Sequence, residues 1–497
     1  MKKNIRYSFI SLLFLLGSVS CVDLAEMNID PNNASTTNPQ LLLTSISFNA
    51  FNNSGKSPMY AMRQLVQTDG ESSSQLYKWN RGDFGDYSSL RNIYKMDEEA
   101  LRTNQPVFRA LASFFKAHYY YRLAMTFGNV PCSEAIKGET DALFFPKYDS
   151  QEEVLLFVLK ELENANSILT VYENEPISGD IIYNGDAKKW RKLVNAYRLK
   201  VLMSFSQKSQ IGNLPVADTF AKIVSSEPLM ESEADNGQLI YLDQQSNRYP
   251  YFNDSDFGSG MYMDSTYIAL LAQRKDPRLF AIATQIPKAA EAARPIDDFS
   301  SYDGGDPIKP YAEVNTKAAN GLVSKPQPRY YKNATNEPFI LLGFSEQQLI
   351  LAESIVRGWT QGDDQAFYDS AVKASFRFYA TYAKDFATYL TEADADKYLN
   401  GQLVAYDKSM NARDKIERIV TQKYIPSFLQ AGGWFGLFEY QRTGYPELRK
   451  NDLMQVPYRW MYPQSEYNNN PDNVQSALSS QFGGNDRITD KTWIFNQ

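Results

Sequence analysis

Histidine and cysteine, the side chains that most often carry metal or nucleophilic chemistry, are scarce in this sequence. The 497 residues include one histidine, His118, and two cysteines, Cys21 and Cys132. A zinc site needs about four such ligands, and a histidine-based nucleophilic triad would have to use His118. His118 lies on the apolar face of a predicted helix, so we expect a packed core histidine, and Cys132 is expected to be a packed free thiol. The sequence therefore predicts no metal site and no catalytic residues.

Carboxylates offer the remaining route to catalysis or metal binding. Two pairs, Asp254 with Asp256 and Asp303 with Asp306, could coordinate calcium together with loop carbonyls, although neither has the EF-hand spacing. A glycosidase needs two carboxylates that flank the scissile bond, and no acid pair stands in a convincing motif. We expect no cofactor, with calcium at one of these pairs as the alternative.

Aromatic residues are plentiful, and tyrosine is the most frequent of them, with 33 copies. A tyrosine ring can be buried on one side while its hydroxyl stays in water, which favours broad contact surfaces. The formal net charge of −7 gives no positive field to attract phosphates, so nucleic acid is not expected as a partner.

Residues 1–20 have the pattern of a targeting segment. Three basic residues within the first six positions precede an apolar run that is too short to span a bilayer. A small residue then directly precedes Cys21, as in bacterial lipoprotein signals, although Ser18 stands where leucine is usual. We expect residues 1–20 to be removed, Cys21 to carry a lipid anchor, and residues 21–38 to form a tether. An ordinary secretory signal is the alternative.

Most elements that would position these residues are predicted to be helices. The helices fall into pairs of about 35 to 40 residues, mainly within 87–228 and 344–430, a period typical of a tetratricopeptide-type solenoid. Apolar residues recur at helical spacing in the segments 40–51, 87–101, 107–127, 150–169, 187–205, 345–357, 368–390 and 416–429.

Polar residues mark several of the helix starts. Ser150 and Ser345 each stand three residues before a Glu or Gln, which is the capping-box spacing. Asp186 is a candidate N-cap for the helix that follows it. Gly358 is a natural stop for the helix that begins near Ser345.

Two stretches interrupt the helical pattern. Residues 230–340 are rich in Pro, Gly, Asp, Asn, Ser and Tyr, with one short helix predicted at 264–272, and residues 456–497 are similarly irregular. An irregular stretch of this length is usually functional. We expect residues 39–497 to form a single, mostly α-helical domain in which the loop-rich 230–340 region packs on the helical repeats.

Several motifs, in one order along nearly the whole chain, resemble the SusD/RagB family of outer-membrane lipoproteins, and its SusD-like branch in particular. Each motif alone is weak, and together they are specific. The matches thin out between 302 and 338, where ligand specificity could lie. The motifs are NIDPN (28–32), YRLA (121–124), FGNVP (127–131), YDSQEEV (148–154), NAYRLK (195–200), KDPRL (275–279), LAES (351–354), RGW (357–359), TQKY (421–424) and RTGYP (442–446).

The resemblance implies about four tetratricopeptide-like helix pairs with an irregular region packed on them. It also implies a lipoprotein of the outer membrane that faces the cell exterior. Such a protein binds a nutrient oligomer, with a glycan favoured, and delivers it to a SusC-like TonB-dependent transporter as a hinged lid. It implies no enzymatic activity. An oligopeptide is the alternative ligand in the same role.

A sugar ring has apolar faces and hydroxyl edges, so a flat aromatic ring beside amides or carboxylates suits it. Residues of these types gather in predicted loops. The first patch is Asp69, Gln75, Tyr77, Trp79 and Asn80, the second is Tyr249, Tyr251 and Phe252, and the third is Tyr302. For the first patch the alternative is that Trp79 anchors the loop to the core. For the second it is the packing of a proline-containing turn.

Three other tryptophans, Trp190, Trp359 and Trp434, are assigned to core or inter-helix packing. If Trp79 is a stacking face, Trp79→Ala should weaken ligand binding and leave the melting temperature little changed. Two further function classes stay open: an all-α lipoprotein glycosidase and a helical-repeat scaffold without a small ligand. Turnover of a bound oligosaccharide would identify the first, and the lack of saturable binding would identify the second.

Overall fold

The computed structural model describes residues 37–52, 54–430 and 432–496. The predicted signal segment, Cys21 and residues 22–36 of the predicted tether lie outside them. Residues 39–497 form one compact unit. Within the described residues, helices dominate, strands occur only as short antiparallel pairs, and no helix is long and apolar enough to cross a membrane. The prediction of a mostly α-helical fold is confirmed.

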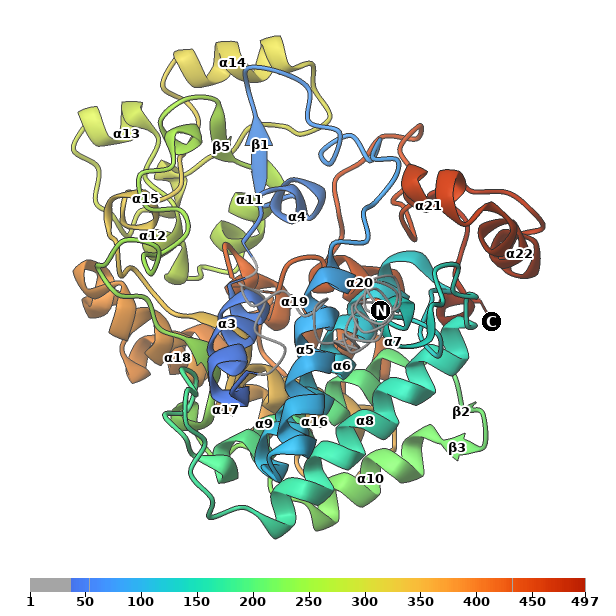
Figure 1. The fold of residues 1–497 in the computed structure, drawn as a ribbon. Coiled ribbons are helices and arrows are strands. Elements are labelled where there is room, and N and C mark those ends of the chain that lie inside the picture. The colour runs from blue at the N-terminus through green and yellow to red at the C-terminus, as the bar shows by residue number, and fades with distance from the viewer. Residues whose placement is uncertain (1–36, 53, 431, 497) are drawn as a thin grey trace, which may run out of the picture. The chain divides into compact units, whose positions relative to one another are not determined.

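Antiparallel helix pairs build the lower half of the molecule in Figure 1. α6 packs against both α5 and α8, α9 contacts α16, and α16 contacts α17 and α19, so the two predicted helical regions share one scaffold. The helices of this scaffold are α3 (Pro39–Phe51), α5 (Asp86–Arg102), α6 (Pro106–Phe127), α8 (Gln151–Val171), α9 (Ala187–Ser204), α16 (Phe344–Val356), α17 (Asp364–Tyr382), α19 (Ala412–Tyr424) and α20 (Phe435–Thr443).

The core between α6 and α9 confirms two packing predictions. Trp190 is fully buried against Phe114 and Phe115, and its indole N–H donates to Asp180 (2.9 Å). His118 Nδ1 lies 2.9 Å from the hydroxyl of Tyr197. Burial lowers the pKa of His118 well below its usual value, because the charged imidazolium is disfavoured away from water. His118 is therefore a packed, neutral core histidine.

Two of the three predicted helix starts are confirmed, and one is wrong. Ser150 and Glu153 form the capping box of α8, and Asp186 caps α9 by accepting from two backbone N–H groups. α16, however, begins at Phe344, ahead of Ser345. Its first N–H donates to the side chain of Asn236 (2.8 Å). A residue distant in the sequence therefore supplies the cap, which local spacing does not reveal.

The loop-rich region 230–340 is more regular than expected. The predicted helix is found as α11 (Ser265–Gln273), and the region also forms several short helices. It contributes strands to two antiparallel pairs, one between its own two ends and one with a segment near residue 65. Helices this short depend on tertiary packing, so they leave little periodicity in the sequence. They are α12 (Arg278–Ile282), α13 (Pro287–Glu291), α14 (Tyr311–Ala319) and α15 (Arg329–Lys332). The strands are β4 (Gly237–Leu239) paired with β6 (Phe339–Leu342), and β5 (Met261–Met263) paired with β1 (Leu65–Gln67).

The C-terminal stretch 456–497 also departs from the predicted irregular structure. It contains α21 (Gln464–Asn469) and α22 (Pro471–Phe482), seen in red in Figure 1. α22 buries Val474, Ala477 and Leu478 on one face, a helical spacing that the Asn-rich run before it obscures. The remaining elements outside the 3-10 turns are α4 (Ser57–Ala61), α7 (Gly138–Asp141), β2 (Gln210–Ile211), β3 (Leu214–Pro215), α10 (Val216–Ser226) and α18 (Glu392–Leu399).

Candidate ligand-binding surface

The first predicted patch is divided between surface and core. Asp69 and Asn80 are exposed, whereas Gln75, Tyr77 and Trp79 are buried. The buried members use their polar atoms internally: the Tyr77 hydroxyl donates to the carbonyl of Ala61 (2.9 Å). The Trp79 indole N–H donates to the carbonyl of Arg459 (3.3 Å). That these residues bind a ligand stays a prediction, but Tyr77 and Trp79 have the contacts of core anchors.

Trp79 belongs to a cluster of three tryptophans that the sequence analysis did not foresee. Its ring stacks on Trp460 (centroids 5.0 Å apart, 19° between planes), and Trp434 meets Trp460 edge-on at 4.6 Å. Trp79 and Trp460 are buried, whereas Trp434 keeps part of its surface in water. The partly exposed ring of this cluster is therefore Trp434, which also packs against the core, as predicted. The glycine pair Gly432–Gly433 just before it was the available signal for an aromatic residue on a surface loop.

The second and third patches are also turned inward. Tyr249 and Tyr251 are buried and meet Phe339 at centroid distances of 5.5 and 6.0 Å. Phe252 is partly exposed, with the guanidinium of Arg248 at 5.4 Å from its centroid. Tyr302 is buried, and its hydroxyl donates to the carbonyl of Ile296 (2.9 Å).

The segment of the first patch contacts the chain that follows the second and third patches. β1 pairs with β5, so that the Thr68 N–H donates to the carbonyl of Gly260 (2.9 Å), one residue before β5. The Gln75 side chain donates to the carbonyl of Pro307 (3.1 Å), just beyond Tyr302 along the chain. These contacts place the first patch next to residues near 260 and 307, and most of the rings of the three patches are buried.

Each carboxylate of the two predicted calcium pairs contacts a side-chain cation. In the first pair, the ammonium of Lys56 lies 2.6 Å from Asp254 and 2.5 Å from Asp256. In the second pair, Lys317 lies 2.6 Å from Asp303, and two guanidinium nitrogens of Arg449 donate to Asp306. Among the described residues, no group of three or more His, Cys, Asp or Glu is placed to hold a metal. Calcium binding stays a prediction, in which the ion would have to displace these cations.

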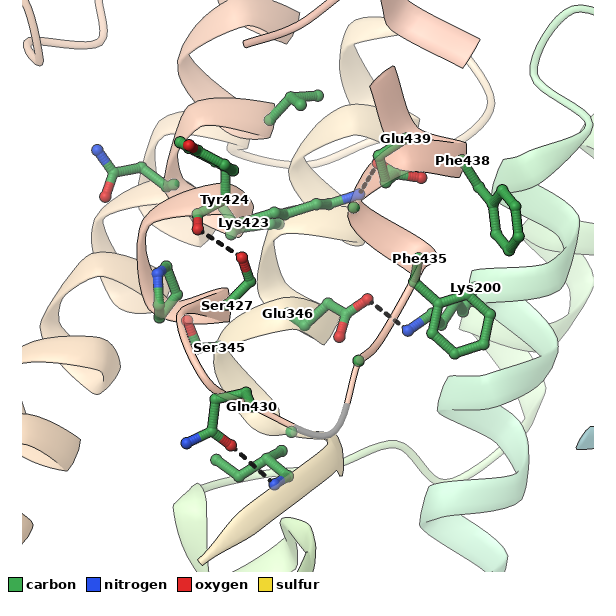
Figure 2. A pocket seen from close by; sticks show the side chains of 18 of the residues that line it. Lys200, Ser345, Glu346, Lys423, Tyr424, Ser427, Gln430, Phe435, Phe438 and Glu439 are labelled. Carbon is green, nitrogen blue, oxygen red and sulfur yellow. Dashed lines mark hydrogen bonds and ion pairs between the residues drawn. The ribbon is translucent and has the colours of Figure 1, made fainter. Parts of the chain in front are cut away.

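A cavity of about 170 Å³ lies between α9, α16, α17, α19 and α20 (Figure 2). Two lysine–glutamate pairs line it: Lys200 with Glu346 at 2.9 Å and Lys423 with Glu439 at 3.1 Å. Phe435 closes one side, next to Lys200 (4.4 Å to the ring centroid). The cavity is smaller than the sites that usually hold drug-sized ligands, and its charges are already paired.

Beside this cavity, α20 contributes to a buried ion cluster. Arg442 binds Glu353 (Nη2–Oε2, 2.9 Å) and Glu439 (Nη2–Oε2, 2.7 Å), and Glu353 and Arg442 are almost fully buried. Burial opposes the ionisation of Glu353, but Arg442 and Lys423 outweigh it and hold the pKa of Glu353 below its usual value. The cluster thus joins α16, α19 and α20 by satisfied charges and has the character of a structural element.

Comparison with known proteins places this chain in one family. The SusD-like family model, described as starch-binding associating with outer membrane, matches residues 31–463. An outer membrane protein from Bacteroides vulgatus, whose description assigns it to nutrient binding, is 57% identical. Its crystal structure superposes with a TM-score of 0.90, over 93% of this chain and all of that one.

Two further solved structures extend this comparison. A SusD homologue from Bacteroides fragilis is 47% identical with a TM-score of 0.88. A chitin-binding protein is 25% identical with a TM-score of 0.73, and both comparisons cover 93% of this chain and all of the other. No curated protein matches the chain. SusD-like structures have a tetratricopeptide-like helical fold, so that prediction is confirmed. The chain belongs to the SusD-like family of nutrient-binding proteins associated with the outer membrane.

Proposed function

We propose that this protein is a cell-surface lipoprotein that captures a nutrient oligomer, preferably a glycan, and passes it to a SusC-like TonB-dependent transporter as its lid. The observation that carries the proposal is the match to a nutrient-binding outer membrane protein at 57% identity over its entire chain. The chitin-binding relative supports a glycan as the ligand class. An oligopeptide is the second candidate ligand.

The tryptophan cluster supports this role as a place for sugar stacking. Trp434 offers the partly exposed ring, and Asn80, which follows the buried Trp79, is exposed with an amide side chain. An aromatic face beside an amide matches the apolar face and hydroxyl edge of a pyranose. Trp79 and Trp460 then hold Trp434 in place from behind.

The proposal includes no catalysis and an anchor at Cys21. Each carboxylate that lines the cavity, Glu233, Glu346 and Glu439, is bound to a lysine or arginine, an arrangement suited to structure rather than to proton transfer. A lipid on Cys21 would keep the protein at the outer membrane. Cys21→Ala should then be exported but released from the membrane, and retention of this variant in cells that lack the transporter would contradict the anchor.

Calorimetry on residues 22–497 tests the binding role. Neutral and acidic oligosaccharides, N-glycans, fructans and short peptides would be titrated in turn, with product analysis after each titration. Saturable binding of one glycan class without turnover is expected. Turnover would favour the glycosidase, peptide binding alone would favour the second ligand class, and no binding even by the purified pair with the transporter would favour the scaffold.

A further inference from the structure

A second concave site lies on the outer face of α20, away from the cavity of Figure 2. It is a surface hollow of about 330 Å³, between the end of α20 and the segment that leads to the tryptophan cluster. Residues that line it include Tyr440, Gln441, Lys450, Met454, Tyr458 and Thr489. Its volume falls within the range of sites that hold small ligands.

Hydrogen-bonding capacity in this hollow is left unused. The Gln441 amide N–H donates to the carbonyl of Pro457 (2.6 Å), but its Oε1 is buried and has no hydrogen-bond partner in the described part of the chain. A buried acceptor without a donor costs free energy, and rotation of the Gln441 side chain toward the hollow would let a ligand hydroxyl satisfy it. Tyr440 and Tyr458 are both partly exposed and provide the ring surface beside it.

The charge in the lining of the hollow is positive, although the whole chain is acidic. Lys450 is the only charged residue in its lining, and it makes no ion pair within residues 37–52, 54–430 and 432–496. The ammonium of Lys491 lies 5.3 Å from the ring centroid of Tyr458. Glu447, in the same segment, does not line the hollow, but its charge acts on the lining residue Tyr440.

Arg63 adds a third cation behind the hollow. Its side chain is fully buried, and Nη2 lies 3.8 Å from the sulfur of Met454, a lining residue. It donates to the carbonyls of Arg449 and Gln75 (2.8 and 2.6 Å), and no carboxylate of the described residues lies within ion-pair distance of it. The guanidinium also lies over the ring of Tyr77 and interacts with the buried carboxyl of Asp264, so its positive charge is partly compensated.

We propose that this hollow binds a sugar ring that carries an anionic group, so that the ligand is an acidic glycan. The inference rests on the proposed glycan-binding function and narrows its ligand class. Lys450 attracts the anionic group, and the rings of Tyr440 and Tyr458 contact the apolar face. Gln441 Oε1 accepts a hydrogen bond from a sugar hydroxyl once its side chain turns toward the hollow.

The hollow would bind one sugar residue of a longer glycan. Arg63 lies 4.4 Å from the ring centroid of Tyr77, Tyr77 meets Trp79 at 6.1 Å, and Trp79 meets Trp434 at 5.3 Å. These contacts run through buried side chains, so the hollow and the tryptophan cluster pack on one shared set of buried residues. A glycan could place one residue on Trp434 and an acidic residue in the hollow.

The test is a set of titrations with residues 22–497 at low and high NaCl. The probes are oligogalacturonates and alginate oligomers as uronates, sulfated galactan oligomers, and neutral gluco-, galacto- and xylo-oligosaccharides. We expect the tightest saturable binding among the acidic probes, weakened by salt because exposed charges are screened. The uronate and sulfate arms identify which anionic group the hollow prefers.

Lys450→Gln tests the assignment of the site, and Lys222→Gln is its matched control, an exposed lysine on α10. Lys450→Gln should weaken binding of the best acidic probe about tenfold or more, the typical effect of losing a hydrogen bond to a charged group. Gln441→Leu should weaken it as well, and Lys222→Gln should change nothing. Binding of neutral probes alone, or acidic binding that is indifferent to Lys450, would overturn this inference and leave the glycan-binding function standing. Binding of peptides but of no saccharide would overturn both.

Discussion

The polar groups on one face of α20 have partners within the protein, whereas an acceptor on its other face lacks one among the described residues. On the inner face, Arg442 and Glu439 belong to a buried cluster in which every charge has an opposite partner. On the outer face, Gln441 keeps a buried acceptor without a donor, beside Lys450, which has no partner among the described residues. The two faces are one residue apart along the same short helix.

The paired charges of the inner face stabilise the fold, whereas the unpaired groups of the outer face are available to a ligand. A satisfied buried charge cluster costs several kcal/mol to break, and it offers nothing to a ligand. An unsatisfied buried acceptor costs the apoprotein stability that a ligand can recover, whereas an exposed cation such as Lys450 is solvated by water and stays available to an anionic ligand. The predictions below test this separation.

The largest effect is expected on the inner face. Arg442→Met should lower the free energy of unfolding by about 3–5 kcal/mol, because it leaves Glu353 and Glu439 buried without their main partner. Denaturant unfolding measures this loss. Arg449→Met, which removes a surface cation from Asp306, is the control and should cost far less. Similar losses in both variants would show that the buried cluster contributes no more to the free energy of unfolding than a surface ion pair does.

Trp79 and Trp434 should show the same contrast, with Trp79 needed mainly for stability and Trp434 mainly for binding. Trp79→Ala should cost about 3–5 kcal/mol of stability, as for a buried aromatic ring. This replaces the expectation, drawn from its position in a loop, that Trp79→Ala would leave the melting temperature little changed. Trp434→Ala should lower stability less and weaken glycan binding by about 2 kcal/mol, as for an aromatic binding hot spot. Thermal unfolding and calorimetry on both variants check the pair, and equal stability losses would remove the distinction.

Acid should weaken the inner face before it affects the outer one. The pKa values of Glu353 and Glu439 are both lowered in the folded state, because burial is outweighed by Arg442 and Lys423. Their contribution is therefore present above the unfolded glutamate pKa of about 4.3 and is lost as the pH falls below it. Stability measured from pH 7 to 3 should fall more steeply in the wild type than in Arg442→Met. Parallel curves would contradict the assignment.

The smallest effect is expected from Lys450→Gln on stability. Because Lys450 is exposed and has no ion-pair partner in the described chain, the melting temperature of the free protein should not change. With an acidic glycan present, the wild type should be stabilised more than the variant. A drop in the melting temperature of the free variant would mean that Lys450 has a structural role.

The sequence predicted the scaffold better than the surface. The long helices α6, α8 and α9 were visible because each repeats apolar residues over many turns and two carry local caps at Ser150 and Asp186. The short helices around α12 and the cap from Asn236 depend on contacts between distant segments, which leave no local pattern. The same limit applied to Trp79 and Trp434. Trp79 stands in a polar segment and Trp434 in an apolar segment with several glycines. Contacts with the distant Arg459 and Trp460 bury Trp79, which neither segment reveals.

The hydrogen bond from Trp79 to Arg459 joins residues 380 positions apart, and that from Arg63 to Arg449 joins residues 386 apart. Contacts of such sequence separation close large loops and form late in folding. The helical repeats near the N-terminus can pack as soon as they are made, but the candidate ligand surface has to wait for the last fifty residues. A chain interrupted before that point would have a scaffold without a binding surface, so ligand binding would report that the whole chain has folded.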